Sequence, residues 1–356
     1  MPPDYYADMW RAMIFKGSYI EITNRCNLDC RDCYNSSGRN KQTVELDLDV
    51  LLKYVEDLIV IHSVRSVTFS GGEPLLYSKI DELLDRLAEY TTKYPRVIFN
   101  FVTNGTLYNE KFYYLLENSD RFMVQISLDG PNEESCASMR GVGTFTKVLD
   151  NISRRKFFHK PVFKMIINKT NASFVEEYFH FAYDKLGGLP SFAFANYQGN
   201  AIQNWKEMEL LPSEKAKILT LVQKKYKEYN ITDVTLPVAT VHCDLTDFEG
   251  LRDFCIKPDG SVQPCQNLYD SKFSIGNIYE LDWKSFNDKI SKLVEYLALR
   301  MEQDYGCKKC LLSSNCGRGC PAFAFMKDGN LLGNDGDCDF RRMGTISMIK
   351  AEKCQK

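Results

Sequence analysis

The feature that most constrains the fold is a regular alternation of short β-rich runs and amphipathic stretches, from residue 17 to about residue 230. The β-rich runs hold many β-branched and aromatic residues, which favour strands. Six strands are predicted: Ser18–Thr23, Ser66–Ser70, Val97–Thr103, Phe122–Leu128, Val162–Asn168 and Ser191–Ala195. Because helical patterns separate them, the sequence indicates βα units and a parallel sheet.

The intervening stretches carry apolar residues at i, i+3 and i+4, which places those residues on one helix face. The patterns lie within residues 50–59, 80–87, 145–152 and 174–182, and Ser213–Asn230 adds a further helix. A closed barrel of eight βα units typically needs about 250 residues, more than residues 17–232 provide. We therefore predict an α/β fold, a partial (β/α)6 TIM-like barrel.

The texture of the sequence changes at about residue 233, where the alternation fades and cysteine, glycine and proline become more frequent. The segment CIKPDGSVQPC predicts a hairpin that turns at Pro258–Gly260, and Trp283–Arg300 predicts a helix. The predicted organisation is an N-terminal extension (1–16), the barrel (17–232), a cysteine-rich domain (233–345) and a C-terminal tail (346–356).

Composition restricts the possible partners and compartment. The chain has 45 Lys and Arg against 47 Asp and Glu, a net charge of -2, which argues against a broadly basic nucleic-acid or membrane binder. No apolar run reaches 18 residues, and the N-terminus lacks the pattern of a signal peptide, so we expect a cytoplasmic protein. In that reducing compartment the 13 cysteines indicate metal ligands or redox centres rather than disulfides.

Cys26, Cys30 and Cys33 form a C-x3-C-x2-C motif directly after the first predicted strand. Three thiolates in a tight loop suit a [4Fe–4S] cluster, which normally has four cysteine ligands. Supplying three leaves one iron open for a substrate or cofactor, as in catalytic zinc sites. The alternatives are a zinc site that lacks its fourth ligand and a set of buried thiols.

This arrangement resembles the radical S-adenosylmethionine (radical SAM) superfamily, in which the motif follows the first strand of a partial barrel. Tyr34 matches an aromatic residue next to the third cysteine, and Gly71, Gly72, Glu73 and Pro74 match the family's GGEP motif. The resemblance implies that the open iron binds SAM and that one electron cleaves a carbon–sulfur bond. The 5′-deoxyadenosyl radical then removes hydrogen from a substrate.

The same resemblance suggests further SAM-binding residues. The backbone edge and the carboxylate of GGEP are expected to receive the methionyl ammonium by a charge-assisted hydrogen bond. Asn104 follows strand three, Ser127 and Asp129 follow strand four, and Arg140 is a candidate partner of the SAM carboxylate. The alternatives are ordinary polar strand ends and, for Arg140, a solvated loop charge.

Eight cysteines in the C-terminal third have the spacing C-x9-C, then C-x2-C-x5-C-x3-C, then a last cysteine, with one cysteine upstream. This resembles the SPASM domain, which binds auxiliary clusters in peptide-modifying radical SAM enzymes. By analogy, Cys243, Cys255, Cys265 and Cys320 hold auxiliary cluster I, and Cys307, Cys310, Cys316 and Cys338 hold cluster II. The chain would then carry three [4Fe–4S] clusters and SAM. The alternative is a pair of zinc sites.

The resemblance implies a peptide or protein substrate and an external electron donor such as flavodoxin or ferredoxin. We favour oxidative crosslinking, or a similar modification, of a ribosomally made peptide (RiPP maturation) over formylglycine formation in sulfatases. In the sulfatase branch an aspartate follows the second hairpin cysteine, whereas here Gln266 follows Cys265, and an amide is no general base at neutral pH.

Tyr34, Gln266 and Asn267 are candidate catalytic residues because they would line the site. Further alternatives are small-molecule radical oxidation and a non-enzymatic iron–sulfur electron carrier. An electron carrier needs neither an open iron nor the GGEP motif.

Overall fold

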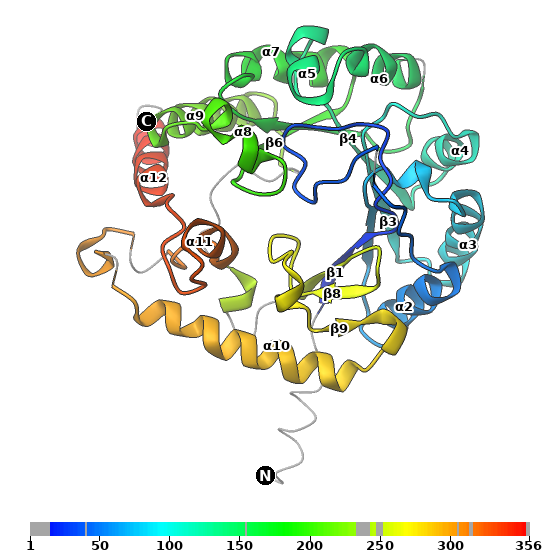
Figure 1. The fold of residues 1–356 in the computed structure, drawn as a ribbon. Coiled ribbons are helices and arrows are strands. Elements are labelled where there is room, and N and C mark those ends of the chain that lie inside the picture. The colour runs from blue at the N-terminus through cyan, green and yellow to red at the C-terminus, as the bar shows by residue number, and fades with distance from the viewer. Residues whose placement is uncertain are drawn as a thin grey trace.

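The computed structural model describes residues 15–39, 41–153, 155–232, 243–246, 252–304, 306–312 and 316–353. Six parallel strands pair in chain order and curve into an open barrel surrounded by helices (Figure 1). They are β1 Phe15–Glu21, β2 Ser66–Ser70, β3 Ile98–Thr103, β4 Phe122–Ser127, β5 Val162–Ile167 and β6 Leu189–Phe194. The predicted partial (β/α)6 barrel is confirmed.

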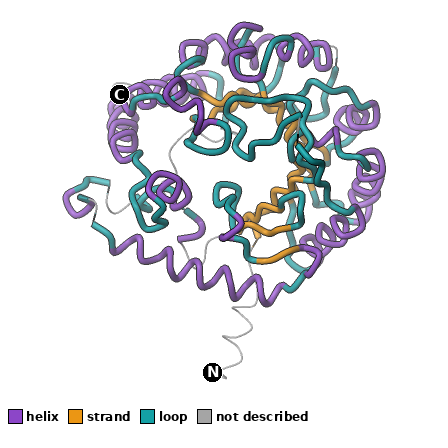
Figure 2. Tube along the Cα trace, in the orientation of Figure 1, coloured by secondary structure: helices purple, strands orange, loops and turns teal. Residues whose placement is uncertain are grey.

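The helices of this half lie outside the strands, as Figure 2 shows by the purple coils around the orange arc. They are α2 Leu48–Val60, α3 Ile80–Lys93, α4 Glu110–Asn118, α5 Glu133–Arg140, α6 Thr144–Ile152, α7 Val175–His180, α8 Ala201–Met208 and α9 Pro212–Glu228. Side-chain caps define where several begin. The Asp47 carboxylate accepts from the first turn of α2, and Asn109 does the same for α4.

The core lies between the sheet and these helices. Alternate strand residues point outward into it, and Phe69, Phe99 and Phe101 are fully buried there. The rings of Phe69 and Phe101 stack with centroids 5.2 Å apart. The remaining strand residues face the barrel interior and are more polar; Tyr19, for example, donates to Ser70 Oγ at 2.7 Å. The interior is therefore suited to a polar ligand.

The C-terminal part joins the same sheet. β7 Arg252–Ile256 pairs in parallel with β1, and β8 Ser261–Gln263 and β9 Gly276–Asn277 follow antiparallel, so the order is β6-β5-β4-β3-β2-β1-β7-β8-β9. The predicted hairpin is thus present, and its turn contains Gly260 at φ +82°. Its pairing with β1 was not predicted, because no local pattern encodes a contact across more than 230 residues.

Three helices complete this part: α10 Trp283–Ala298, α11 Pro321–Asp328 and α12 Cys338–Lys353. In Figure 1, α10 runs along the lower edge of the view, below β8 and β9, and α12 packs against α9. Within the described residues, no helix has the length and apolar character needed to cross a bilayer. The domain boundaries at residues 16, 232 and 345 stay predictions.

Candidate functional site

The three cysteines of the C-x3-C-x2-C motif lie in the loop that follows β1, at the carboxyl end of the sheet. Two segments far along the chain fix this loop. Asn200 donates its backbone N–H to the Cys33 carbonyl and its side-chain amide to the Cys30 carbonyl, both at 2.9 Å. Arg31 N–H donates to the Met139 carbonyl at 3.0 Å. The loop is therefore clamped between α5 and the start of α8.

The glycines of GGEP allow β2 to approach the same loop. Gly72 N–H donates to the Thr23 carbonyl at 2.7 Å, and Glu73 N–H donates to the Arg25 carbonyl at 2.7 Å. A Cβ at Gly72 would collide with the Arg25 carbonyl, and Gly71 has φ +149° and lies against Thr23. Only glycine fits here without moving the cysteine loop.

The Glu73 side chain connects the GGEP turn to the end of β3. Its carboxylate is fully buried and accepts from Thr103 Oγ1 at 2.7 Å, from Asn104 N–H at 2.7 Å and from Leu75 N–H at 3.2 Å. Burial raises the pKa of Glu73 to about 7. These contacts hold the carboxylate against the end of β3, and its expected contact with the SAM ammonium stays a prediction. Pro74 begins a single 3-10 turn, Pro74–Leu76.

Asn104, Asp129 and Arg140 converge on the cysteines. Asn104 Nδ2 lies 3.9 Å from Cys26 Sγ, and Arg140 Nη1 lies 3.8 Å from Cys30 Sγ. Arg140 Nε donates to Asp129 Oδ2 at 2.6 Å, and the two side chains are 9% and 0% exposed. Arg140 is therefore a buried cation beside the cysteines, which excludes the alternative of a solvated loop charge.

Burial dominates the electrostatics of this loop. Burial, and then the Asp32 charge, raise the pKa of Cys33 to about 11. Burial, and then the Asp129 charge, raise the pKa of Asp32 to about 7. The thiols are therefore protonated at neutral pH unless a metal stabilises the thiolates. Sequence reasoning missed Asp32, although its position between two motif cysteines was a signal.

A second buried carboxylate lies in the barrel interior and was also missed. Tyr34 Oη donates to Glu21 Oε1, and Tyr269 Oη donates to Glu21 Oε2 at 2.6 Å. Glu21 is fully buried at the end of β1, and burial raises its pKa. The rings of Tyr34 and Tyr269 meet edge to face at 6.0 Å. The loop after β8 therefore touches the loop after β1.

We call Cys243, Cys255, Cys265 and Cys320 the first auxiliary set. Cys265 and Cys320 interact electrostatically with each other and with Cys243, and Cys255 interacts with Cys265. Burial raises the pKa of all four thiols, to about 12 for Cys265. These pairwise effects indicate that the four thiols lie near one another, and the assignment of Cys243 to this set stays a prediction.

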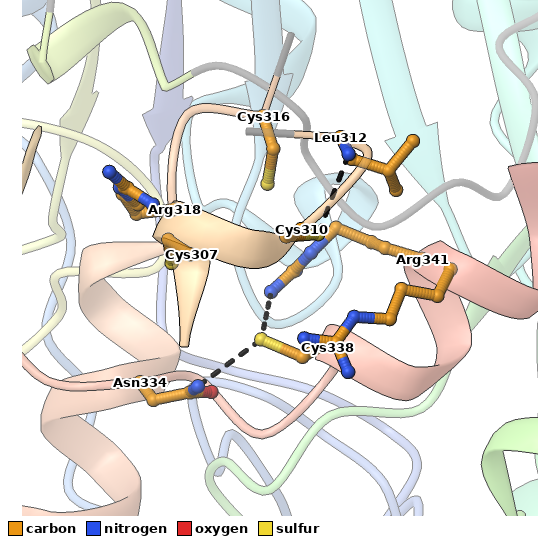
Figure 3. A pocket seen from close by; sticks show the side chains of 9 residues that line it. Cys307, Cys310, Leu312, Cys316, Arg318, Asn334, Cys338 and Arg341 are labelled. Atoms are coloured by element: carbon orange, nitrogen blue, oxygen red, sulfur yellow. Dashed lines mark hydrogen bonds between the residues drawn. The ribbon is translucent and has the colours of Figure 1, made fainter. Parts of the chain in front are cut away.

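We call Cys307, Cys310, Cys316 and Cys338 the second auxiliary set. All four line one pocket, together with Leu312, Asn334 and three arginines (Figure 3). Leu312 N–H donates to Cys310 Sγ at 3.5 Å, and Asn334 Nδ2 donates to Cys338 Sγ at 3.2 Å. This set comes together from the segment before α11 and the first residue of α12.

The remaining candidates lie at the edges of these sites. Ser127 ends β4, and Gln266 and Asn267 lie in the loop that follows Cys265 and leads to Tyr269. Cys136 is buried in α5 and donates to the Gly130 carbonyl at 3.4 Å, whereas Cys354 lies outside the described residues. No three His, Cys, Asp or Glu of the described residues converge as ligands of one metal ion would. In a cubane each thiolate binds a different iron, so the cysteines that hold a cubane lie farther apart than the ligands of a single metal ion.

Comparison with known proteins identifies the family. Residues 20–177 match the model of the radical SAM superfamily. The mycofactocin maturase MftC of Mycolicibacterium smegmatis is 27% identical over 329 residues, covering 89% of this chain and 81% of that protein. The cysteine-type anaerobic sulfatase-maturating enzyme of Clostridium perfringens is 24% identical over 343 residues, covering 86% of this chain and 89% of that protein.

Solved structures share the fold. The sulfatase-maturating enzyme anSMEcpe with bound AdoMet aligns with a TM-score of 0.72 at 21% identity, over 95% of this chain and 99% of that chain. SuiB of Streptococcus suis, bound to S-adenosylmethionine, aligns with a TM-score of 0.72 at 16% identity, over 94% of this chain and 80% of that chain. With the cysteine loop after β1, the family match shows a radical SAM domain over residues 20–177, and the solved structures show that the shared fold extends over nearly the whole chain.

Proposed function

We propose that this enzyme modifies a peptide by hydrogen abstraction, and that Cys26, Cys30 and Cys33 hold its SAM-binding [4Fe–4S] cluster. The observation that carries the proposal is the cysteine loop itself, which offers three thiols beside the N–H groups of Asn104 and Arg140. Hydrogen bonds to cluster sulfurs are typical of iron–sulfur sites. The donor set fits a cluster with one open iron, which is the position that SAM needs.

When bound, the cluster and SAM supply a 5′-deoxyadenosyl radical. The chain's own residues position and seclude it. Arg140 keeps its Nη2 for the SAM carboxylate, because its Nε is fixed by Asp129 and its Nη1 lies against Cys30. The GGEP backbone follows β2, Ser127 ends β4 on the other side of β3, and both are proposed to contact the rest of SAM. The Glu73 carboxylate, which accepts from Thr103 and Asn104, holds the GGEP backbone in position beside the end of β3.

Each auxiliary set is proposed to hold one further [4Fe–4S] cluster. The support is the convergence of the eight thiols in two groups of four, as two cubanes require. Asp335 links the groups, because its Oδ2 accepts from the Cys320 N–H at 2.9 Å and from Arg341 Nη1 at 2.8 Å. We propose flavodoxin or ferredoxin as the external electron donor.

The proposed substrate is a peptide, and the reaction an oxidative crosslink or a similar modification. SuiB has been solved with its precursor peptide SuiA, and MftC is a maturase. A cleft with a volume of about 510 Å³ lies between the end of β6 and α11, and Tyr197, Trp205 and Met326 help line it. Its size and aromatic lining suit an extended peptide.

Formylglycine formation is the second candidate, supported by the likeness to sulfatase-maturating enzymes. In that branch the residue after the second hairpin cysteine is an aspartate that takes a proton, and here it is Gln266. Because an amide has no proton-accepting capacity at neutral pH, the crosslinking reaction is the better fit.

The test is anaerobic reconstitution, reduction and incubation with SAM. We expect 5′-deoxyadenosine from the wild-type enzyme and none from Cys30→Ala, with iron near ~12 per chain for three cubanes. Cys136→Ala is the matched control, because that thiol lies outside the three sets. Stoichiometric zinc with little iron, or no 5′-deoxyadenosine from an iron-replete protein, would contradict the proposal.

Incubation with two kinds of peptide substrate distinguishes crosslinking from formylglycine formation. A short peptide encoded beside the enzyme should lose two hydrogens on crosslinking, as read by mass spectrometry. A sulfatase peptide that contains the target cysteine should remain unchanged. Conversion of the cysteine to formylglycine would favour the second candidate.

A further inference from the structure

The second auxiliary set lies in a more cationic setting than the first. Its pocket is lined by Arg318, Arg341 and Arg342 in addition to the four cysteines (Figure 3). In the first set, Glu21, Asp253 and Lys257 act on Cys255. Asp244 and Arg300 act on Cys243, so carboxylates and cations are mixed around this set. The inference that follows rests on the proposed function, because it requires a cluster in each set.

Arg342 and Arg318 both bring positive charge to Cys310, and of these two Arg342 also acts on Cys338. Arg342 lines the same pocket as both cysteines, with a side chain that is 45% exposed. Its nearest carboxylate, Asp339, lies 3.5 Å away with a side chain that is 66% exposed, so water screens that pairing.

Arg341 is balanced within the protein. Its Nη2 lies 2.6 Å from Asp335 Oδ1, and the two side chains are 6% and 1% exposed. The same Nη2 lies 3.8 Å from Cys338 Sγ. Because its charge is matched by a buried carboxylate, Arg341 acts mainly as a structural pair that connects the second set to Cys320 through Asp335.

A cation in contact with a cluster sulfur changes the energy of electron uptake. Reduction adds one negative charge to the cluster, and a nearby positive charge stabilises the reduced form. Hydrogen bonds to the sulfurs act in the same direction, and both are recognised means of adjusting a cluster potential. Carboxylates near the first set have the opposite effect.

We propose that Arg342 raises the reduction potential of the cluster in the second set, so that electrons leaving the barrel collect there. The step moves one electron: the reduced cluster of the first set is oxidised, the oxidised cluster of the second set is reduced, and no atoms are exchanged. Arg342 thereby determines where an electron rests before it leaves the enzyme. It is a positioning residue, since it does not touch the substrate.

The experiment is a redox titration of the full-length reconstituted enzyme, followed by electron paramagnetic resonance without SAM or peptide. The signal of the second set is identified by its loss in Cys316→Ala. In Arg342→Gln the reduced-to-oxidised ratio of that signal at fixed potential should fall about tenfold, a shift of about 59 mV for one electron. Arg342→Lys should keep the ratio within about threefold of wild type, because the charge remains.

Two further variants sharpen the test. Asp339→Asn removes the carboxylate that partly neutralises Arg342, so its midpoint potential should move upward. This variant tests the same charge if Arg342→Gln binds less iron. Arg86→Gln is the matched control, because Arg86 lies on α3, is 50% exposed and pairs with Glu89.

An unchanged midpoint in Arg342→Gln at full iron content would overturn the proposal. So would an equal fall in Arg342→Lys, or a midpoint in Asp339→Asn that does not rise. A wild-type enzyme with iron near ~8 per chain and no signal lost in Cys316→Ala would instead contradict the cluster assignment of the proposed function. The two failures are therefore distinguishable.

Discussion

The buried pair of Asp129 and Arg140 permits a quantitative test of the site's construction. We expect Asp129→Asn to lower the free energy of unfolding by about 3 kcal/mol, the lower end of the 3–5 kcal/mol for breaking a buried ion pair. The asparagine Oδ1 retains the acceptor for Ile166 N–H, which Asp129 Oδ1 binds at 2.8 Å. The cost therefore reports the lost charge. The lower end applies because Asp32, whose pKa the Asp129 charge helps to raise, supplies a replacement carboxylate.

The assay is urea unfolding of the reconstituted enzyme, followed anaerobically by circular dichroism. Glu89→Gln is the control, because the pair of Arg86 and Glu89 is 50% and 67% exposed and should contribute about 0–1 kcal/mol. The double variant Asp129→Asn/Arg140→Gln should cost less than the sum of its single variants, since it leaves no unpaired charge. A cost below about 1 kcal/mol for Asp129→Asn would refute this reasoning.

Three further outcomes follow from the same geometry. Gly72→Ala should abolish most of the SAM-responsive cluster signal in electron paramagnetic resonance, because its Cβ would collide with the Arg25 carbonyl. Burial lowers the pKa of Lys164 to about 8, so the unfolded chain binds more protons above pH 8 and stability should rise from pH 8 toward the unfolded lysine pKa. Lys164→Met should flatten that rise in urea titrations at several pH values. Tyr269→Phe should cost about 1–3 kcal/mol on unfolding, because it leaves a Glu21 oxygen unsatisfied, whereas the exposed Tyr296→Phe should be neutral.

The sequence predicts features that local patterns encode. Strand Ser66–Ser70 and the start of α10 at Trp283 are as expected, because alternation and helical periodicity depend on near neighbours. The helices α4, α5 and α8 were missed, whereas α6 and α7, which are no longer, were predicted from their apolar residues at i, i+3 and i+4. The two auxiliary cysteine sets could be proposed from the sequence because the spacing of the cysteines resembles that of the SPASM domain.

The long-range contacts that organise the site could not be predicted from the sequence. The interaction of Tyr269 with Glu21 joins residues 248 positions apart, and nothing local indicates it. The contacts of the Glu73 carboxylate were likewise not predicted. The motif indicated a special turn, but it did not show that this carboxylate accepts from Thr103 and Asn104 at the end of β3.

The pairing of β7 with β1 has a consequence for how the enzyme is divided. In this register Tyr19 lies beside Cys255, so a cysteine of the first auxiliary set belongs to the strand ladder of β1, the strand that leads into the loop of Cys26, Cys30 and Cys33. The spacing between the two sites is then set by backbone hydrogen bonds and does not vary with hinge motion. A chain cut before β7 would expose the edge of β1, a ready template for aggregation. Barrel and C-terminal part are therefore better regarded as one cooperative unit than as a catalytic module with an appendage.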